Sequence, residues 1–359
     1  MKTVRVKTDS KEYDVFIGAR ATKNLPEFLH THFPNCSKLF LLTDETVAKL
    51  HLESLTDLLA DFSYDTYVVP SGEKAKTFDV YYDCLTFALQ KNFDRKSIVL
   101  ALGGGAVGDL AGFVAATFMR GIPFIQLPTT ILAHDSAVGG KVAINHPEGK
   151  NMIGAFYQPE AVFYNTSAIS TLPDKEIKSG FAEVIKHALI SDQEFYATLL
   201  ELDDLSRLTE QELVDFLQKG IKIKAKIVGE DEKETGIRAY LNFGHTLGHA
   251  IEAEMGYGNM THGEAVAIGM IFALTLSKKK YELDFSVSDF SNWLEKLNYQ
   301  VQIPDHLDLD RLISRMKQDK KSFNGDIHFV LLEKIGQPKV VKIAEEEIKE
   351  ELQLFKERM

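Results

Sequence analysis

A buried-looking strand that ends in a run of glycines constrains the fold of this chain more than any other feature. Residues 97–108 read SIVLALGGGAVG, and a helical pattern follows directly. Gly103, Gly105 and Gly108 match G-x-G-x-x-G, in which glycines let the backbone approach a pyrophosphate and the next helix's N–H groups bind its charge. Such turns also end ordinary strand–helix units, so the pattern indicates either a dinucleotide site or a plain connection.

Strand and helix patterns alternate through the first half of the chain. A hairpin is expected at 3–8 and 13–17, strands at 38–43, 67–70, 98–102 and 124–127, and helices at 45–59, 78–91 and 109–119. This alternation is typical of a parallel sheet with helices on both faces, so we expect an α/β, Rossmann-like nucleotide-binding domain. Ligands of such sheets bind outside the carboxyl ends of the strands.

The ribose contact of the expected dinucleotide is missing from its usual place. The standard pattern has an acidic residue about 20 positions after the glycines, but residues 123–128 read PFIQLP, with no acid. Asp44 directly follows the strand predicted at 38–43, at the carboxyl edge of the sheet. We therefore predict Asp44 as the ribose contact.

The pattern changes after about residue 172 to one helix after another. Helices are expected at 174–190, 211–228, 246–254, 264–278 and 287–297, a late hairpin at 327–332 and 339–343, and an amphipathic helix at 345–359. We place the boundary near residue 170. A nucleotide-binding α/β domain at 1–170 is thus expected to precede an all-α C-terminal domain at 171–359, helical apart from the late hairpin, with the active site in the cleft between them.

Composition excludes several classes of protein. The chain has 359 residues and 45% hydrophobic content, enough for two cores, and a net charge of −11, which argues against a nucleic-acid partner. Its two cysteines exclude a disulfide framework or thiolate metal cage and suit a reducing compartment. The N-terminus lacks a signal-peptide core, and no apolar run approaches the ~20 residues of a membrane span. We expect a cytoplasmic protein with a small-molecule ligand, without nucleic-acid or membrane partners.

Histidines and glutamates gather in the second half at spacings that suit a metal ion. His245 and His249 stand at i and i+4 on one helical face, and Glu183 and His187 repeat that spacing on another helix. His262 precedes a glycine and a glutamate at a predicted helix start. A single pair is more often a packed or surface pair, but three clusters in one helical domain indicate a metal site. Neutral histidines with a carboxylate suit a catalytic zinc with an open position.

Some basic residues lie in surroundings unusual for a solvated charge. Most lysines of a chain with net charge −11 are expected at the surface. Arg120, Lys141, Lys186 and Arg238, however, stand among apolar residues or glycines. Charges in such places need partners, and a small substrate with a phosphate and a carboxylate would supply them.

These residues give the chain a resemblance to the 3-dehydroquinate synthase family over essentially its full length. The matching segments are GGGAVGD at 103–109, FMRG at 118–121, PTTIL at 128–132, GGK at 139–141, GKNMIGAFYQP at 149–159, AEVIK at 182–186, LNFGHTLGH at 241–249, HGE at 262–264 and DKK at 319–321. Nine matches in the same order are far more specific than any one of them.

The resemblance implies site residues by position. The family binds one zinc or cobalt ion through a glutamate and two histidines, which correspond to Glu183, His245 and His262. The implied NAD contacts are Asp44, Ser71, Gly72, Glu73, Lys74, Lys76, Gly104, Gly105, Gly108, Asp109, Thr129, Thr130, Lys141, Lys150, Ala168, Ser170 and Thr171. The implied catalytic and substrate contacts are Arg120, Asp135, Lys141, Asn151, Lys186, Lys224, Arg238, Asn242, His249 and one lysine of 319–321, taken as Lys320.

The reaction is also implied by the resemblance. The family converts 3-deoxy-D-arabino-heptulosonate 7-phosphate to 3-dehydroquinate and phosphate by transient oxidation with NAD, β-elimination of phosphate, re-reduction and intramolecular aldol closure. Arg120 corresponds to a residue that reaches the neighbouring subunit's site, which implies a homodimer. The loop before Asp135 is one residue shorter than in most of the family, and we predict a structural role for its His134.

Three other functions stay open. A metal- and NAD-dependent polyol dehydrogenase would share the glycine turn and the metal helix, but has little need for so many cations in apolar surroundings. A sibling sugar-phosphate cyclase acts on a substrate without a carboxylate, whereas Arg238 and Asn242 favour a carboxylated one. A non-catalytic NAD-binding regulator would be expected to have lost some ligands, and the sequence has all of them.

Overall fold

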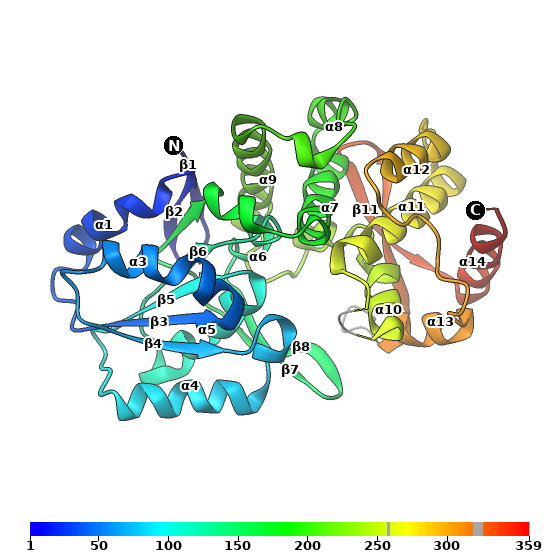
Figure 1. Ribbon diagram of the computed structural model, residues 1–359. Coiled ribbons are helices and arrows are strands. Elements are labelled where there is room, and N and C mark those ends of the chain that lie inside the picture. The colour runs from blue at the N-terminus through cyan, green and yellow to red at the C-terminus, as the bar shows by residue number, and fades with distance from the viewer. Residues whose placement is uncertain (257–258, 319–325, 359) are drawn as a thin grey trace. The chain divides into compact units, whose positions relative to one another are not determined.

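The structure, a computed structural model, describes residues 1–256, 259–318 and 326–358 (Figure 1). The chain divides into two compact units, and each is described by itself. Met1–Pro173 and Thr209–Lys233 form the first unit, and Asp174–Leu208 and Glu234–Met359 form the second. Within the described ranges, none of the helices combines the length and apolar content needed to cross a membrane.

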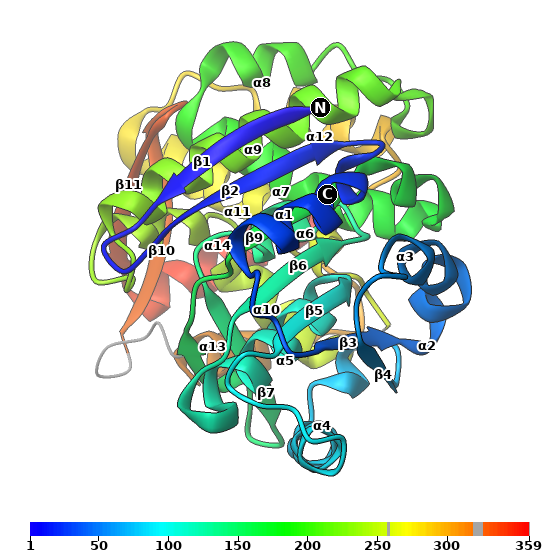
Figure 2. The same ribbon diagram turned by 90° about the vertical axis from the view of Figure 1, so that its left-hand side faces the viewer.

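A seven-stranded sheet forms the centre of the first unit (Figures 1 and 2). The strands are β1 (Lys2–Lys7), β2 (Glu12–Gly18), β3 (Leu39–Asp44), β4 (Tyr64–Val69), β5 (Ile98–Gly103), β6 (Phe124–Pro128) and β9 (Ala161–Asn165). They lie in the order β1-β2-β9-β6-β5-β3-β4, and every neighbouring pair is parallel except β1 with β2. Both β3 and β5 are buried at every position, which confirms the predicted parallel α/β sheet covered on both faces.

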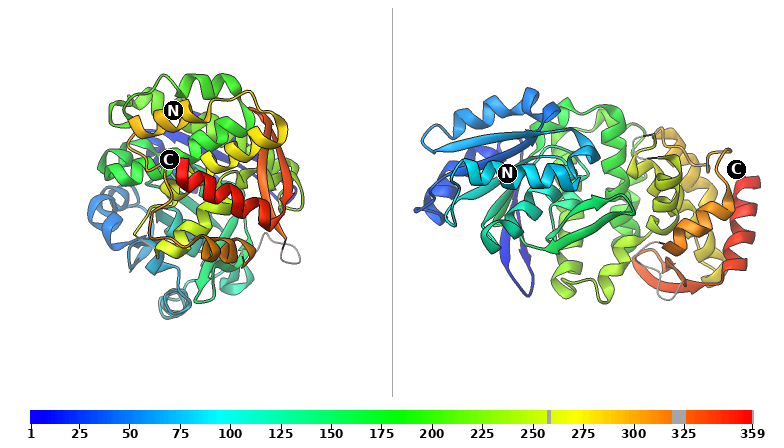
Figure 3. Two further views of the ribbon diagram at one scale, coloured as in Figure 1. Left: turned by 90° about the vertical axis from the view of Figure 1, so that its right-hand side faces the viewer. Right: turned by 90° about the horizontal axis from the view of Figure 1, so that it is seen from below.

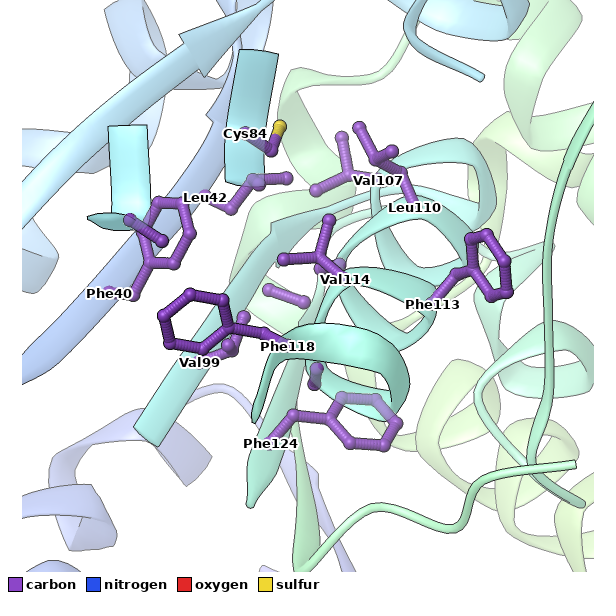
Figure 4. Packing of buried hydrophobic residues seen from close by; sticks show 14 of the residues in the cluster. Phe40, Leu42, Cys84, Val99, Val107, Leu110, Phe113, Val114, Phe118 and Phe124 are labelled. Atoms are coloured by element: carbon purple, nitrogen blue, oxygen red, sulfur yellow. The ribbon is translucent and has the colours of Figure 1, made fainter. Parts of the chain in front are cut away.

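Two hydrophobic clusters lie on the two faces of this sheet. Successive side chains of a strand point to opposite faces, so Phe40 and Leu42 of β3 enter one cluster while Leu39 and Leu41 enter the other. Figure 4 shows the first cluster, in which residues of the sheet pack against helix residues such as Val114. The helices of the sheet region are α1 (Leu25–His32), α2 (Glu45–Val47), α3 (Glu53–Leu58), α4 (Phe78–Gln90), α5 (Gly105–Thr117) and α6 (Ala133–Ser136).

A separate hairpin packs against α5. It is formed by β7 (Lys141–His146) and β8 (Gly149–Phe156), which pair antiparallel. The register shifts between Ile144 and His146, where one residue of β7 faces three of β8, so the extra residues of the bulge lie on β8. The hairpin contains three of the residues predicted to contact NAD or substrate.

One long helix differs from the sequence-based domain boundary. The segment predicted as a helix at 211–228 was placed with the second domain, but α9 (Glu210–Glu230) belongs to the first unit and packs on β1 and α6. The buried carboxylate of Glu232, just past its end, accepts hydrogen bonds from Ser10 N at 2.9 Å and Gln158 Nε2 at 2.7 Å. Side-chain pairing between distant segments decides this placement, and helical periodicity does not reveal it.

The second unit is mainly helical, with one two-stranded sheet (Figures 1 and 3). Its helices are α7 (Asp174–Ser191), α8 (Gln193–Leu199), α10 (His245–Met255), α11 (His262–Tyr281), α12 (Val287–Lys296), α13 (Leu309–Gln318) and α14 (Glu345–Arg358), and its strands are β10 (Ile327–Lys334) and β11 (Gln337–Ile343). Helix α11 is buried along most of its length because α7, α10, α12 and β10 pack around it. Thr261 and Glu264 form a capping box that fixes where this helix begins.

Candidate active site

Three side chains of the second unit converge as a metal ion would require. Glu183 comes from α7, His245 opens α10 and His262 opens α11. One ligand atom of each lies within 4.8 Å of the others, and Glu183 Oε1 is 3.4 Å from His245 Nε2 and 3.3 Å from His262 Nε2. Glu183 is fully buried, and in the described part of the chain its Oε1 has no hydrogen-bond partner. A buried carboxylate oxygen left in this way fits a bound cation.

Each histidine of this cluster has an acceptor behind it. His245 Nδ1 lies 3.1 Å from the carbonyl oxygen of Phe243, and His262 Nδ1 lies 3.1 Å from Glu252 Oε2. A ring that donates from Nδ1 presents its Nε2 lone pair on the other side, toward Glu183. The sequence analysis did not identify Glu252, although it stands seven residues after His245 on the same helix.

The surroundings lower the pKa of the Glu183 carboxyl group and raise the pKa of the His262 imidazole. Burial alone would raise the pKa of Glu183, but the charges of Lys186 and His245 outweigh it and hold that pKa well below its usual range. Lys186 forms a buried ion pair with Glu183 one turn away on α7. Burial opposes protonation of His262, yet the carboxylates of Glu183 and Glu252 raise its pKa to about 9.

His249 lies beside this cluster. Its ring centroid is 5.2 Å from that of His245 and 5.8 Å from that of His262. His187, the partner of Glu183 in the i,i+4 pattern, is fully buried on α7. The converging atoms thus come from three helices, and neither i,i+4 pair supplies the set by itself.

Other predicted substrate residues of the second unit lie in and beside the short helical segment Ile237–Asn242. Arg238 is only 1% exposed, which is unusual for a guanidinium. Asn242 Nδ2 donates to Glu234 Oε1 at 3.1 Å, and Glu234 adopts a left-handed backbone conformation with φ of 59°. Lys320 and Lys321 lie outside the described residues.

In the first unit, the glycine turn lies at the carboxyl end of β5, as predicted. Gly104 is the N-cap of α5, and a β-carbon there would lie 2.9 Å from Thr130 Cγ2, so the turn lies close to the segment that follows β6. The hydroxyls of Thr129 and Thr130 are buried and have no hydrogen-bond partner among the residues described. Free helix N–H groups beside unpartnered hydroxyls form an arrangement suited to a phosphate or a ribose.

Asp44 is the N-cap of helix α2. Its Oδ1 accepts from Thr46 N at 2.9 Å, Val47 N at 3.1 Å and Ser71 Oγ at 2.9 Å. These bonds hold the carboxylate at the carboxyl edge of β3 and join it to Ser71, another predicted NAD contact. The predicted ribose contact is therefore at the expected edge of the sheet, with a structural role as well.

A second group of predicted residues surrounds Lys76, whose ammonium is almost fully buried. Lys76 Nζ lies 2.6 Å from Asp109 Oδ2 and 2.5 Å from Asn151 Oδ1. Burial is the main cause that raises the pKa of Asp109, and the Lys76 charge opposes it. Lys150 Nζ lies 3.6 Å from Glu73 Oε1. The structure thus brings together five residues of the predicted cofactor and substrate sets.

Lys224 and Asp135 form a separate pair in the first unit. Lys224 Nζ lies 2.8 Å from Asp135 Oδ2 and also contacts the Asp135 backbone carbonyl. Lys224 comes from α9, so the placement of that helix in the first unit brings this lysine to α6. His134, next to Asp135, is fully buried, with Nδ1 2.7 Å from the carbonyl oxygen of Ile131, which fits the predicted structural role.

The remaining predicted NAD residues lie at or near the carboxyl edge of the sheet. A small cavity there is lined by Thr22, His51, Ser54, Leu55, Leu102, Leu127, Pro128, Thr129, Asn165 and Ala168. His51, which the sequence analysis did not identify, lies with Nε2 3.0 Å from Thr171 Oγ1. Gly72, Lys74 and Ser170 are exposed, as are Lys141 at the start of β7 and Arg120 after α5.

The fold and these clusters define an α/β protein with a dinucleotide-type glycine turn and a Glu–His–His metal-type cluster in a helical unit. Two family models match the chain: 3-dehydroquinate synthase N-terminal at residues 66–179, and 3-dehydroquinate synthase C-terminal at residues 180–322. The chain belongs to the 3-dehydroquinate synthase family.

Relatives at high identity extend over the whole chain. It is 54% identical to the 3-dehydroquinate synthase of Geobacillus thermodenitrificans over 347 residues, 96% of this chain and 95% of that one. It is 52% identical to the 3-dehydroquinate synthase of Bacillus mycoides over 361 residues, covering all of both chains. Among solved structures, 2-deoxy-scyllo-inosose synthase complexed with carbaglucose-6-phosphate, NAD⁺ and Co²⁺ is similar, with a TM-score of 0.88, 26% identity and coverage of 99% of this chain and 100% of that chain.

Proposed function

We propose that this protein is a 3-dehydroquinate synthase, a carbon–oxygen lyase of the shikimate pathway of aromatic amino acid biosynthesis. It converts 3-deoxy-D-arabino-heptulosonate 7-phosphate to 3-dehydroquinate and phosphate. The observation on which the proposal rests is the convergence of Glu183, His245 and His262 in a chain that is 54% identical to a relative of that name. The similar sugar-phosphate cyclase of known structure is only 26% identical, which favours the synthase over a sibling activity.

The Glu–His–His cluster is the proposed metal site. Two imidazole nitrogens and a carboxylate oxygen form the donor set of a catalytic zinc site with an open position, and Co²⁺ accepts the same donors. When bound, the ion supplies a Lewis acid that lowers the pKa of a substrate hydroxyl. The buried Lys186 beside Glu183 places a positive charge next to the ligand set, where it favours an anionic substrate oxygen.

The first unit holds the proposed NAD site. The N–H groups of α5 at Gly104 and Gly105 would bind the pyrophosphate, and Thr129 and Thr130 offer hydroxyls beside them. NAD supplies a reversible hydride acceptor when bound. Asp44 lies at the edge of the sheet where a ribose would be expected.

Buried cations such as Lys224 and Arg238 suit the two anionic groups of the substrate. Arg238 is suited to a carboxylate because its guanidinium can donate two parallel hydrogen bonds. Lys224 is held by Asp135, which orients the ammonium and limits its freedom before the substrate binds. Such positioning lowers the entropic part of the barrier to phosphate elimination and ring closure.

Assembly and location complete the proposal. Arg120 is exposed and adopts a left-handed backbone conformation with φ of 69°. This position supports a homodimer in which Arg120 reaches the neighbouring subunit's site. The low cysteine content supports a cytoplasmic location.

One assay tests the proposed activity. Purified protein is supplied with the heptulosonate phosphate, NAD⁺ and Zn²⁺, and inorganic phosphate and NADH absorbance are followed together. Phosphate release without NADH accumulation is the expected result, because the hydride is returned in each turnover. Stoichiometric NADH would instead identify a dehydrogenase, and turnover of sedoheptulose 7-phosphate in preference to the heptulosonate would identify a sibling cyclase.

A further inference from the structure

One side chain outside every predicted site, Asn145, joins two segments of the proposed NAD and substrate sites. Its Nδ2 donates to Glu73 Oε2 at 2.7 Å, and its Oδ1 accepts from the backbone N–H of Asn151 at 2.9 Å. Its own backbone N–H donates to the carbonyl oxygen of Lys76 at 2.7 Å. A single residue therefore contacts three of the residues that the proposed function uses.

The hairpin places Asn145 there by an irregularity in its ladder. Ile144 pairs with Ile153 and His146 pairs with Gly149, so the register shifts across Asn145. Between these two pairs β7 has one residue and β8 has three, so the extra residues of the bulge lie on β8, the strand that contains Asn151. Bulges occur often next to active sites. The Asn145 N–H donates to the carbonyl oxygen of Lys76.

The residue held by Asn145 adopts a left-handed backbone conformation. Asn151 has φ of 57°, in a region that asparagine adopts more readily than most residues with a side chain. Its side-chain oxygen accepts from Lys76 Nζ, which also bonds Asp109. The bond from Asn151 N to Asn145 Oδ1 stabilises the conformation in which Asn151 meets Lys76.

We propose that Asn145 is a positioning residue that couples the NAD contacts Glu73 and Lys76 to the substrate contact Asn151. Its bonds to Glu73 and Lys76 hold the β7–β8 hairpin against the segment that contains these two residues. Loss of its bonds releases both segments. NAD then binds more weakly, and Asn151 is no longer held in the conformation in which it meets Lys76. The inference rests on the proposed function, since it takes these residues as ligand contacts.

The sharpest variant is Asn145→Asp in the zinc-loaded protein. It keeps the oxygen that accepts from Asn151, but it replaces the amide donor with a carboxylate 2.7 Å from the Glu73 carboxylate. We expect the Kd for NAD⁺, measured by calorimetry, to rise at least about tenfold, which corresponds to about 1.4 kcal/mol. Asn145→Ala, which adds no charge, should raise it about three- to tenfold.

A reversed pair separates positioning from general damage. In the double variant Asn145→Asp with Glu73→Gln, the amide and the carboxylate exchange places, so a hydrogen bond between them forms again with donor and acceptor reversed. We expect its Kd for NAD⁺ to lie within about threefold of Glu73→Gln alone, which would be a coupling between the two positions. His146→Ala, at the exposed neighbouring position, is the matched control and should leave the Kd unchanged.

The Kd for NAD⁺ in these variants decides whether Asn145 has the proposed positioning role. A Kd within twofold of the parent in Asn145→Asp overturns the inference, as does a double variant whose loss equals the product of the two single losses. If Asn145→Asp fails to fold by circular dichroism, the comparison of Asn145→Ala with His146→Ala decides the matter by the same Kd criterion. A parent protein that binds no NAD⁺ would refute the proposed function itself, and that result is distinct from a failure of the Asn145 variants.

Discussion

Gly269 is the position at which helix α11 lies closest to the start of α10, and Gly269→Ala tests how strictly the metal site depends on that contact. A β-carbon at residue 269 would lie 1.9 Å from the carbonyl oxygen of Gly244 and 3.0 Å from the amide nitrogen of Gly248. Both atoms are backbone, so no change of side-chain rotamer can relieve the overlap. Because real contacts of this kind are not shorter than 3.0 Å, the helices must separate by at least 1.1 Å, the difference between 3.0 and 1.9 Å.

A separation of α10 from α11 would move the proposed metal ligands, because one ligand lies at the start of each helix. His245 is the first residue of α10 and follows Gly244, while His262 is the first residue of α11. Metal–ligand distances tolerate deviations of only about 0.2 Å, so the forced shift exceeds the tolerance several times. We expect Zn²⁺ affinity to fall on the order of 100-fold or more, and the metal-free protein to lose about 1–3 kcal/mol of unfolding free energy, as for an overpacked core.

Two measurements check this prediction. Urea unfolding in the presence of a chelator gives the free energy of the metal-free protein, and competition with a chromophoric chelator gives the Zn²⁺ affinity. Thr275→Ala on the same helix is the control, because among the described residues the Thr275 hydroxyl bonds only to Ile271 O, at 3.0 Å within its own helix, and Thr275 is half-buried. A Gly269→Ala protein with unchanged Zn²⁺ affinity and stability within about 0.5 kcal/mol of the parent would refute the reasoning.

Two further predictions concern buried carboxylates. Glu252→Gln should weaken Zn²⁺ binding about 10- to 100-fold in chelator competition, because it removes the carboxylate that orients His262. Glu232→Gln should lower the unfolding free energy at pH 7 by about 1.5–3 kcal/mol, because its amide cannot accept all the bonds of the carboxylate. Burial alone would raise the pKa of Glu232, but hydrogen bonds from Ser10 and Gln158 lower it. Its stabilising effect is therefore complete above the ordinary glutamate pKa of about 4.3 and is lost as the pH falls through the lower folded-state value, so the difference in urea unfolding between variant and parent should shrink progressively as the pH falls below about 4.3.

Each of these predictions has a contrary outcome. Parental Zn²⁺ affinity in Glu252→Gln would mean that His262 is oriented by packing alone. A stability deficit of Glu232→Gln that does not shrink as the pH falls below about 4.3 would mean that shape rather than charge accounts for the effect.

Local patterns in the sequence were sufficient for the architecture of the first unit. Strands such as 38–43 and 98–102 are continuous apolar runs because both of their faces are buried, and this signal depends only on neighbours in the chain. The glycine turn at 103–108 was equally visible, since the G-x-G-x-x-G pattern lies directly after a buried strand. Resemblance to a family, rather than spacing, was needed to select His262 over His249 as the candidate metal ligand.

Tertiary structure decided what periodicity could not. Helix α9 has the pattern of any amphipathic helix, and only its packing on β1 and α6 assigns it, with Lys224, to the first unit. Glu252 and Asn145 belong to no motif because their partners lie in other elements, and a side chain's role in orienting another residue is set by contacts across the fold. The sequence by itself thus determined which elements form and which chemical groups are available, whereas the distances that join those groups into sites follow from long-range packing.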